Sequence, residues 1–324
     1  MSVESAVFPH RLGSFPPPGV GDAYVMAPTR NPLVHLARRA PAPVDGLLQI
    51  AGAVFGDTAG LATGDDNFDA WDPEHIARTL PLLNPLLSAY FRSEVRGIEN
   101  VPATGPALLV GNHSGGTMIV DTFLFTFAFY DHFGPDRRFH QLAHDIAARI
   151  PGLRRFGTLV ASHENAERAF AAGAPVLVYP GGDVETFRPS WHSARVEFAG
   201  RKGFVRLALD QGVPIVPVVS IGGQETALFL TRAQHLARAL RLDRLARVKV
   251  LPISIGPPFG VNVLDLPGRL PLPAKITTEV LPPIDLKERF GPHPDTDAVY
   301  EHVTSVMQDA LDRLADERTL PVVG

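Results

Sequence analysis

The chain has 324 residues, of which 45% are hydrophobic, so it can bury a large core in one domain or in two modest ones. Its 30 Lys and Arg residues nearly balance its 34 Asp and Glu residues, and the formal net charge of −4 excludes a bulk nucleic-acid binder. The absence of cysteine excludes disulfide scaffolds, thiolate nucleophiles and cysteine-based zinc sites.

The first part of the chain divides into two segments. Residues 1–45 are rich in proline and lack periodicity, which predicts an extended N-terminal arm. Residues 46–91 predict a helical segment, because Asp72 supplies an N-cap carboxylate directly before a proline. This helix is expected to continue to about Tyr90. One apolar face is expected from Ile76, Leu80, Leu83 and Leu87.

Residues 92–324 alternate short β-rich runs with helical patterns. Strands are predicted at 93–98, 107–110, 138–142, 158–161, 176–179 and 215–220. Helices are predicted at about 117–131, 145–150, 163–172, 203–211 and 295–316. This alternation predicts an α/β domain with a largely parallel central sheet flanked by helices, ending in a C-terminal helix.

The first group of chemically competent residues follows the strand at 107–110. His113 lies in the loop after this strand, where α/β sheets bind ligands, and imidazole is a natural base near neutral pH. Asp121 is a candidate to orient it. In a continuous helix the two would lie about 80° apart in azimuth and ~12 Å apart along the axis. They can therefore meet only if residues 114–117 form a loop. The alternative is an Asp121 that only complements the helix dipole.

A hydrolase reading competes for the same loop. In it, Ser114 is a nucleophile on a tight strand-to-helix turn, which requires glycine two residues before and two residues after the serine. Gly116 meets the second requirement, but Asn112 occupies the first position.

Four motifs in order resemble those of the glycerolipid acyltransferase (PlsC-like) superfamily. Gly111-Asn112-His113 followed by Asp121 resembles the first motif, although the family usually has His-x4-Asp and here seven residues intervene. The later motifs are matched by Phe156–Ser162, Val178–Asp183 and Val213–Val218. The resemblance covers roughly residues 92–290. It implies a glycerol-3-phosphate acyltransferase-like fold, with acyl-CoA as co-substrate and no bound cofactor or metal.

Two departures from the family pattern bear on the acceptor. Ser162 stands where the family usually has an arginine that grips a phosphate, and Gly181 stands where many members have an acid. The Tyr-Pro-Gly-Gly string resembles the monoacylglycerol and diacylglycerol acyltransferase branch, which implies a neutral hydroxyl acceptor. A lysophospholipid (lysophosphatidate) acceptor is the alternative. A non-catalytic lipid-binding relative is the alternative from another class.

Further candidates for substrate binding surround these motifs. The loop residues Ser114, Gly115 and Gly116 are expected beside the substrate, and the N–H groups of Gly181 and Gly182 are candidates to stabilise an oxyanion. Asp183 and Glu185 are expected either to bind acceptor hydroxyls or the pantetheine arm, or to face solvent. Arg201 and Lys202 begin a helix, where cations oppose the dipole, so bound coenzyme A phosphates would explain them. Arg188 is a weaker candidate of the same kind, and plain exposed cations are the alternative.

The segment 232–249 carries a cation or histidine at every third position, beginning with Arg232 and His235. Over either half this spacing gives a basic helical face typical of an interfacial helix on anionic lipid, with a solvated cationic face as the alternative. No secretory signal is expected, and no apolar run reaches the ~20 residues that a spanning helix needs. The sequence therefore predicts a cytoplasmic protein that associates peripherally with membranes.

Overall fold

A computed structural model describes most of the chain after residue 67. The described residues are 68–144, 148, 151–233, 250–258, 260–263, 265, 269–320 and 322. The predicted N-terminal arm, the first part of the segment 46–91, most of the predicted helix at 145–150 and all but the start of the basic segment 232–249 lie outside these residues.

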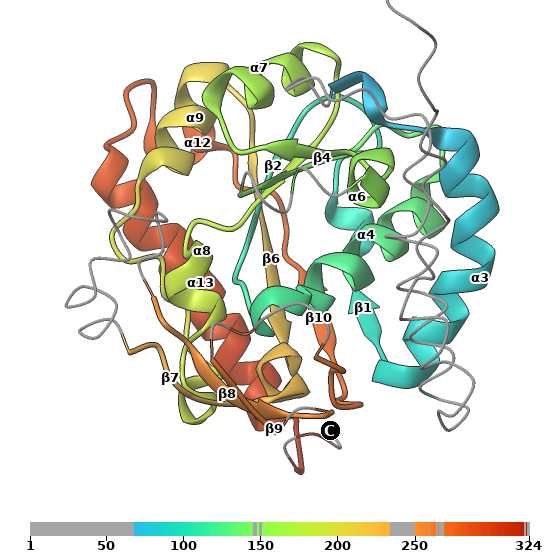
Figure 1. The fold of residues 1–324 in the computed structure, drawn as a ribbon. Helices are drawn as coiled ribbons and strands as arrows, with labels where there is room; N and C mark the ends of the chain where they lie inside the picture. Colours follow the sequence, from blue (N-terminus) through green and yellow to red (C-terminus); the bar gives the residue numbers. More distant parts are fainter. Residues whose placement is uncertain are drawn as a thin grey trace, which may run out of the picture. The chain divides into compact units, whose positions relative to one another are not determined.

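The described chain forms a central sheet of seven strands in the order β1–β10–β6–β2–β5–β3–β4 (Figure 1). Five neighbouring strands are parallel, which confirms the predicted α/β class: β2 (Leu108–Gly111), β3 (His140–Ala143), β4 (Thr158–Val160), β5 (Val176–Val178) and β6 (Ile215–Ile221). β10 (Thr277–Val280) is antiparallel to β6, and β1 (Glu94–Arg96) is parallel to β10. β10 was not among the predicted strands, whereas the other six lie within two residues of their predicted ends.

The two faces of the sheet carry separate apolar clusters, because successive side chains of a strand point to opposite faces. Leu108 and Val110 of β2 pack with α7 (His163–Ala171), α9 (Gly203–Gln211) and α13 (Thr296–Asp316). Leu109 points the other way, toward the cluster of α3, α4 and α6. These three helices span Pro73–Phe91, Val120–Phe133 and Pro151–Arg155.

Helix α3 begins where the sequence predicts. The side chain of Asp72 accepts a hydrogen bond from the His75 N–H at 2.9 Å, and Pro73 occupies the first turn. The helix ends at Phe91, before Arg92 in the left-handed conformation. Its predicted apolar face is buried against α4, so this helix belongs to the same core as the sheet.

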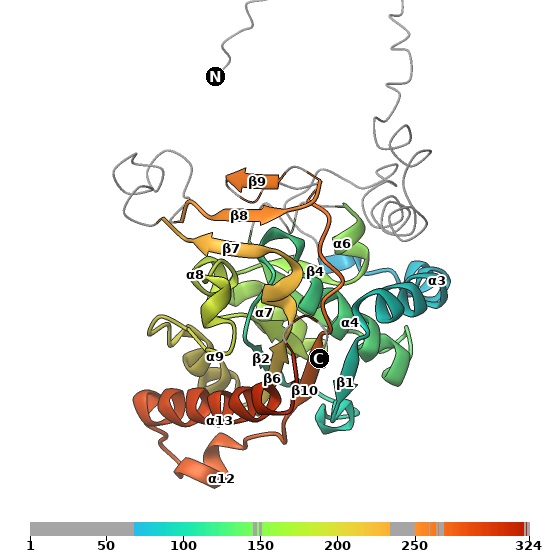
Figure 2. The same ribbon diagram turned by 90° about the horizontal axis from the view of Figure 1, so that it is seen from below.

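A second, three-stranded antiparallel sheet lies beyond the end of β6, where it forms a separate layer (Figure 2). It consists of β7 (Leu228–Thr231), β8 (Ile253–Gly256) and β9 (Gly260–Val263). None of these strands was predicted. The chain leaves the central sheet at Ile221 and re-enters it at Thr277, and these two residues are paired across β6 and β10.

Short helices complete the described fold. Two are α-helical, α8 (Gly182–Thr186) and α12 (Leu286–Phe290). The 3₁₀ turns are η1 (Phe68–Ala70), η2 (Ile98–Asn100), η3 (Gly116–Met118), η4 (Ser190–His192) and η5 (Gly223–Thr226). Within the part of the chain that the structure describes, no helix combines the length and the apolar character needed to cross a bilayer.

Candidate active site

The end of β2 is fixed to β6 by a buried asparagine. The Asn112 side chain donates a hydrogen bond to the Ser220 carbonyl at 2.8 Å, and its oxygen accepts one from the Ser220 N–H at 2.7 Å. Because both bonds go to the main chain of one residue, they fix the direction in which the chain leaves the sheet. The next residue, His113, is thereby presented beyond the carboxyl ends of the parallel strands.

His113 and Asp121 lie within hydrogen-bond distance. His113 Nδ1 is 3.2 Å from Asp121 Oδ2, and the two side chains are 12% and 2% exposed. The same carboxylate oxygen accepts a bond from the Ser114 N–H, and its other oxygen accepts one from the Thr122 N–H. The loop between them contains only the short 3₁₀ turn η3, and helix α4 begins only at Val120, so the continuous helix that would separate the two residues does not form. The longer spacing therefore preserves the pair, which removes the geometric argument for a non-catalytic relative.

The His113 ring is held on its face by Tyr179. The two rings are stacked, with centroids 4.3 Å apart and an interplanar angle of 23°. Burial, reinforced by the nearby Asp121 carboxylate, raises the pKa of Tyr179 well above its ordinary value, so its phenol stays neutral at neutral pH. With Nδ1 donating to Asp121, Nε2 is the histidine nitrogen left to accept a proton.

Glu185 and Arg188 support the main chain of His113. Glu185 accepts hydrogen bonds from the N–H groups of His113 and Glu197 at 2.9 and 2.8 Å, and Arg188 donates to the His113 carbonyl at 2.6 Å. Burial raises the pKa of Glu185, an effect that Arg188 opposes, and burial lowers the pKa of Arg188. Both side chains are fully buried, so they have no surface for a substrate. Their contacts position the histidine in place of the substrate contacts that we expected.

The glycine turn after β5 carries the third motif. The Gly182 N–H donates to the Tyr179 carbonyl at 3.1 Å, so it closes the turn and is not free for an oxyanion. No described residue accepts a hydrogen bond from the Gly181 N–H. Gly181 also lies against the Glu185 carboxylate that holds His113, because a β-carbon at Gly181 would meet Glu185 Oε2 at 2.3 Å. Of the two N–H groups predicted to stabilise an oxyanion, only that of Gly181 therefore remains a candidate.

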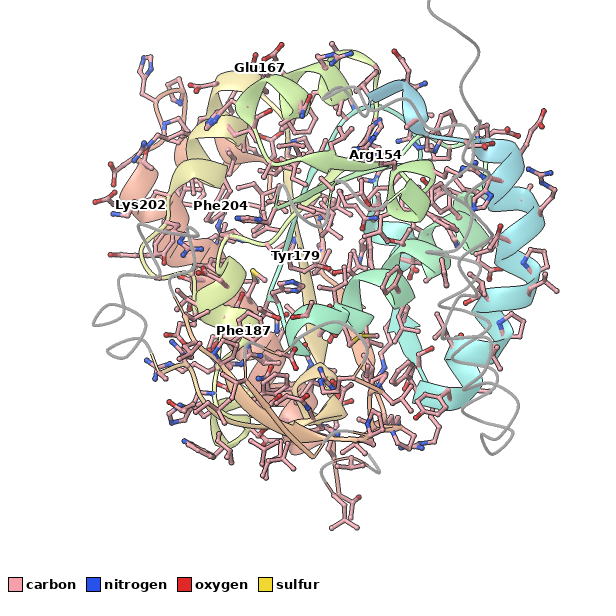
Figure 3. The ribbon with its side chains drawn as sticks, in the orientation of Figure 1. Arg154, Glu167, Tyr179, Phe187, Lys202 and Phe204 are labelled. Atoms are coloured by element: carbon pink, nitrogen blue, oxygen red, sulfur yellow. The ribbon has the colours of Figure 1, made fainter. Side chains whose placement is uncertain are left out.

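Arg201 reaches this turn, whereas Lys202 does not. Arg201 donates to the Gly181 carbonyl at 2.9 Å and to Asp183 Oδ1 at 3.1 Å, and both side chains are about a third exposed. The Lys202 ammonium instead pairs with Asp297 at 2.7 Å. Figure 3 shows Lys202 at the edge of the molecule, well away from Tyr179. The two adjacent cations therefore have different surroundings, and only Arg201 lies beside the proposed site.

The predicted loop contacts lie behind the histidine. The Ser114 hydroxyl donates to Asp121 at 3.3 Å and is buried, which disfavours the reading in which Ser114 attacks an ester. Gly115 donates its N–H to Gln224 Oε1, and the Gly116 carbonyl accepts from the Thr186 hydroxyl. These three residues shape the loop from within. The sequence analysis gave no role to Gln224, because Gln224 lies 109 positions from Gly115 and no local pattern links the two residues.

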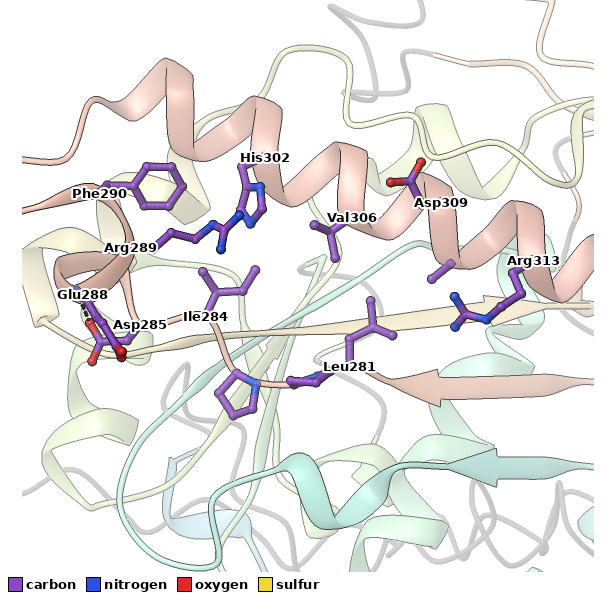
Figure 4. A pocket seen from close by; sticks show the side chains of 13 residues that line it. Leu281, Ile284, Asp285, Glu288, Arg289, Phe290, His302, Val306, Asp309 and Arg313 are labelled. Atoms are coloured by element: carbon purple, nitrogen blue, oxygen red, sulfur yellow. Dashed lines mark hydrogen bonds between the residues drawn. The ribbon is translucent and has the colours of Figure 1, made fainter.

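Other potential sites are separate from His113. A groove of about 1110 Å³ lies between α12, α13 and the chain that follows β10 (Figure 4). It is lined by apolar residues and by charged ones such as Arg289, Asp309 and Arg313, and it contains none of the predicted site residues. Among the described residues, no group of three or more His, Cys, Asp or Glu side chains is placed to hold a metal ion.

Several known proteins are similar to this chain. Residues 92–221 match a family model described as Acyltransferase. An uncharacterized protein of Mycobacterium leprae is 32% identical over 72% of this chain and 63% of its own length. Diacylglycerol O-acyltransferase 2 of Dictyostelium discoideum is 29% identical over 56% of each chain. The 1-acyl-sn-glycerophosphate acyltransferase PlsC of Thermotoga maritima is 16% identical in sequence, with a TM-score of 0.44 over 74% of this chain and 82% of its own.

Residues 92–221 therefore carry an acyltransferase domain, and the chain is similar in sequence to a diacylglycerol O-acyltransferase. The chain spans less than two thirds of the length of the mycobacterial relatives that it matches.

Proposed function

We propose that the protein is an acyl-CoA-dependent O-acyltransferase that moves a fatty acyl chain onto a neutral hydroxyl, such as that of a mono- or diacylglycerol. The observation that carries this proposal is the His113–Asp121 pair, in which Nδ1 faces the carboxylate and Nε2 is left to act as a base. A carboxylate in this position fixes the tautomer and stabilises the imidazolium that forms.

The reaction requires no covalent acyl-enzyme. His113 Nε2 takes the proton of the acceptor hydroxyl. At the same time the hydroxyl oxygen attacks the thioester carbonyl carbon and forms the C–O bond. The resulting oxyanion accepts a hydrogen bond from the Gly181 N–H. When the tetrahedral intermediate collapses, the C–S bond breaks and the coenzyme A thiolate leaves. The thiolate then takes the proton from the His113 imidazolium, which restores the enzyme.

A neutral acceptor is favoured by the surroundings of Ser162. This residue, at the position of the family's phosphate-binding arginine, caps helix α7 by accepting a hydrogen bond from the Asn165 N–H at 3.1 Å. The similarity to a diacylglycerol O-acyltransferase supports the same choice. A lysophospholipid remains the alternative acceptor, with Arg201 as the nearby cation that would pair with its phosphate.

The deciding experiment is an acyl-transfer assay with radiolabelled acyl-CoA and a panel of acceptors: glycerol, monoacylglycerol, diacylglycerol and lysophosphatidate. We expect label in a neutral glyceride and its loss in His113→Ala, with unchanged circular dichroism. His163→Ala, at an exposed histidine of α7, is the matched control and should retain activity. Retained turnover in folded His113→Ala would contradict the mechanism. Label in phosphatidate alone would select the alternative acceptor.

We also propose that the protein associates peripherally with anionic membranes. Leu228, Ile255 and Val261 are paired across β7, β8 and β9, so they form one exposed apolar row on the outer face of the small sheet. The chain that joins β7 to β8 contains the arginine-rich sequence 232–249, whose charge suits anionic headgroups.

Vesicle binding tests this association. Val261→Glu, which places a charge at a 63% exposed position, should weaken sedimentation with phosphatidylglycerol vesicles. Leu82→Glu, at a 73% exposed position on α3, is the control and should bind as the parent protein does. Equal binding of Val261→Glu and the parent protein would exclude the small sheet as the contact surface.

A further inference from the structure

The loop that replaces the usual family spacing must be stabilised by contacts from elsewhere. Gly115, Gly116 and Ile119 all have positive φ angles, of 88°, 64° and 39°. Such a conformation is unfavourable for a β-branched residue, and the loop has only a short 3₁₀ turn of its own. Since Asp121 follows directly, the geometry of this loop decides whether the carboxylate reaches His113.

Two buried residues that follow the small sheet, Asp265 and Arg269, form hydrogen bonds with the main chain of this loop. Asp265 Oδ2 accepts a hydrogen bond from the Thr117 N–H at 2.8 Å, and Arg269 Nη2 donates to the Gly115 carbonyl at 3.0 Å. These contacts lie on either side of Gly116. A β-carbon at Gly116 would meet Asp265 Oδ2 at 2.2 Å, so glycine is what permits the approach.

Asp265 and Arg269 also hold each other. Arg269 Nε donates to Asp265 Oδ1 at 2.8 Å, and the two side chains are 1% and 0% exposed for Arg269 and Asp265, respectively. Asp265 accepts a further bond from the Ser254 hydroxyl of β8, and Arg269 donates to the Thr226 carbonyl at 2.9 Å. The Arg269 guanidinium lies over the Phe229 ring of β7 at 5.5 Å. The pair therefore joins the loop to the small sheet by bonds that satisfy both charges.

From these contacts, we propose that Asp265 and Arg269 are positioning residues that set the loop between His113 and Asp121 and thereby orient the histidine. The role in turnover rests on the proposed acyl transfer. The role in orienting the ring of His113 does not depend on that proposed reaction, because it concerns only the position of the ring. The planar guanidinium is essential here, since its three nitrogens serve Asp265, Thr226 and Gly115 at once.

Arg269→Lys tests this role with the charge retained. Lysine keeps a cation beside Asp265 but offers one nitrogen in place of three. We expect kcat to fall roughly 10–100-fold while KM for the acyl donor and the acceptor stays within about twofold, because the base is misplaced and the substrate contacts are not. The Hε1 NMR signal of His113, assigned by its absence in His113→Ala, should shift or split even without substrate.

Arg137→Lys is the matched control. Arg137 also donates to three carbonyls, those of Pro102, Gly105 and Gly173, and none of these belongs to the loop between His113 and Asp121. It should lower stability without moving kcat or the His113 signal. A folded Arg269→Lys protein with a parent-like His113 signal would overturn the positioning role. If the signal moves but no acyl transfer is found for the parent protein, the positioning role stands and the proposed function fails.

Discussion

The backbone of Gly111 lies directly against the ring of Tyr179. A β-carbon at Gly111 would come within 2.5 Å of Tyr179 Cε1 and 2.9 Å of Cδ1. The same ring stacks on His113, two residues further along the chain. The glycine that opens the first motif therefore makes room for the aromatic residue of the third motif, and the two motifs meet at the histidine.

Gly111→Ala should displace the Tyr179 ring and with it the histidine. We expect a loss of about 1–3 kcal/mol in the free energy of unfolding, measured by urea denaturation, because the methyl group overpacks a buried contact. Turnover should fall as well. Combining Gly111→Ala with Tyr179→Leu should recover part of the stability. Gly203→Ala is the control, since nothing lies within 4 Å of a β-carbon there.

Asp121→Asn removes the negative charge beside His113 and keeps the size of the side chain. The amide cannot stabilise an imidazolium, so we expect kcat to fall roughly 10²–10⁴-fold. KM should change little, because Asp121 is buried behind His113. Steady-state kinetics with acyl-CoA measure both constants. Asp210→Asn, at an exposed position on α9, should behave as the parent protein does, and an equal loss there would point to a general effect of the substitution.

Asn112→Asp should destabilise the fold because Asn112 must both donate and accept. An aspartate at this buried position cannot donate to the Ser220 carbonyl, and we expect a loss of about 3 kcal/mol in chemical unfolding. Asn84→Asp is the matched control. Asn84 accepts a hydrogen bond from Ser88, a role that aspartate retains, so its unfolding free energy should stay close to that of the parent protein.

His140 makes the folded state sensitive to acid. Burial lowers the pKa of His140 from 6.5 to about 4, so the folded state binds fewer protons than the unfolded state between these values. Stability present above pH 6.5 should therefore be lost as the pH falls toward 4, by up to ~3 kcal/mol.

His140→Asn should remove that pH dependence, because the amide can still donate to the Gly157 carbonyl as Nδ1 does and does not titrate. Urea unfolding at pH 7 and pH 4.5 measures the difference. The exposed His163→Asn variant is the control and should keep the parent dependence. If His140→Asn loses as much unfolding free energy between pH 7 and pH 4.5 as the parent protein does, other titratable groups cause the effect.

Much of the fold follows from local patterns. The strands of the parallel sheet are short apolar runs such as Leu108–Val110, whose residues alternate between two buried faces and therefore give a strong signal. The strands β7, β8 and β9 give a weak sequence signal. One face of each strand is exposed, so their short apolar patterns resemble those of loops. β10 gave little signal for another reason, since it has only four residues, Thr277–Val280, and a single valine among them.

The candidate site divides in the same way. His113 and Asp121 could be predicted as a pair because the chemistry of their side chains and a glycine-rich loop are visible in a few residues, and the structure places them within hydrogen-bond distance. Glu185 and Arg188 were found for the wrong contact, since a charged residue beside a motif gives no indication of its burial. Asp265 and Arg269 gave no signal at all, because their contacts are with N–H and carbonyl groups that lie 148 and 154 positions away in the sequence.

The pairing of Ile221 with Thr277 separates what the fold requires from what the active site requires. The chain leaves and re-enters the sheet at facing positions, which a simple hairpin turn could connect. Residues 222–276 are thus an insertion that the sheet does not need, yet it supplies Gln224, Asp265 and Arg269 to the loop of His113. A substitution within this one segment could therefore alter the position of His113, and with it the proposed reaction, while leaving the strand order of the central sheet unchanged.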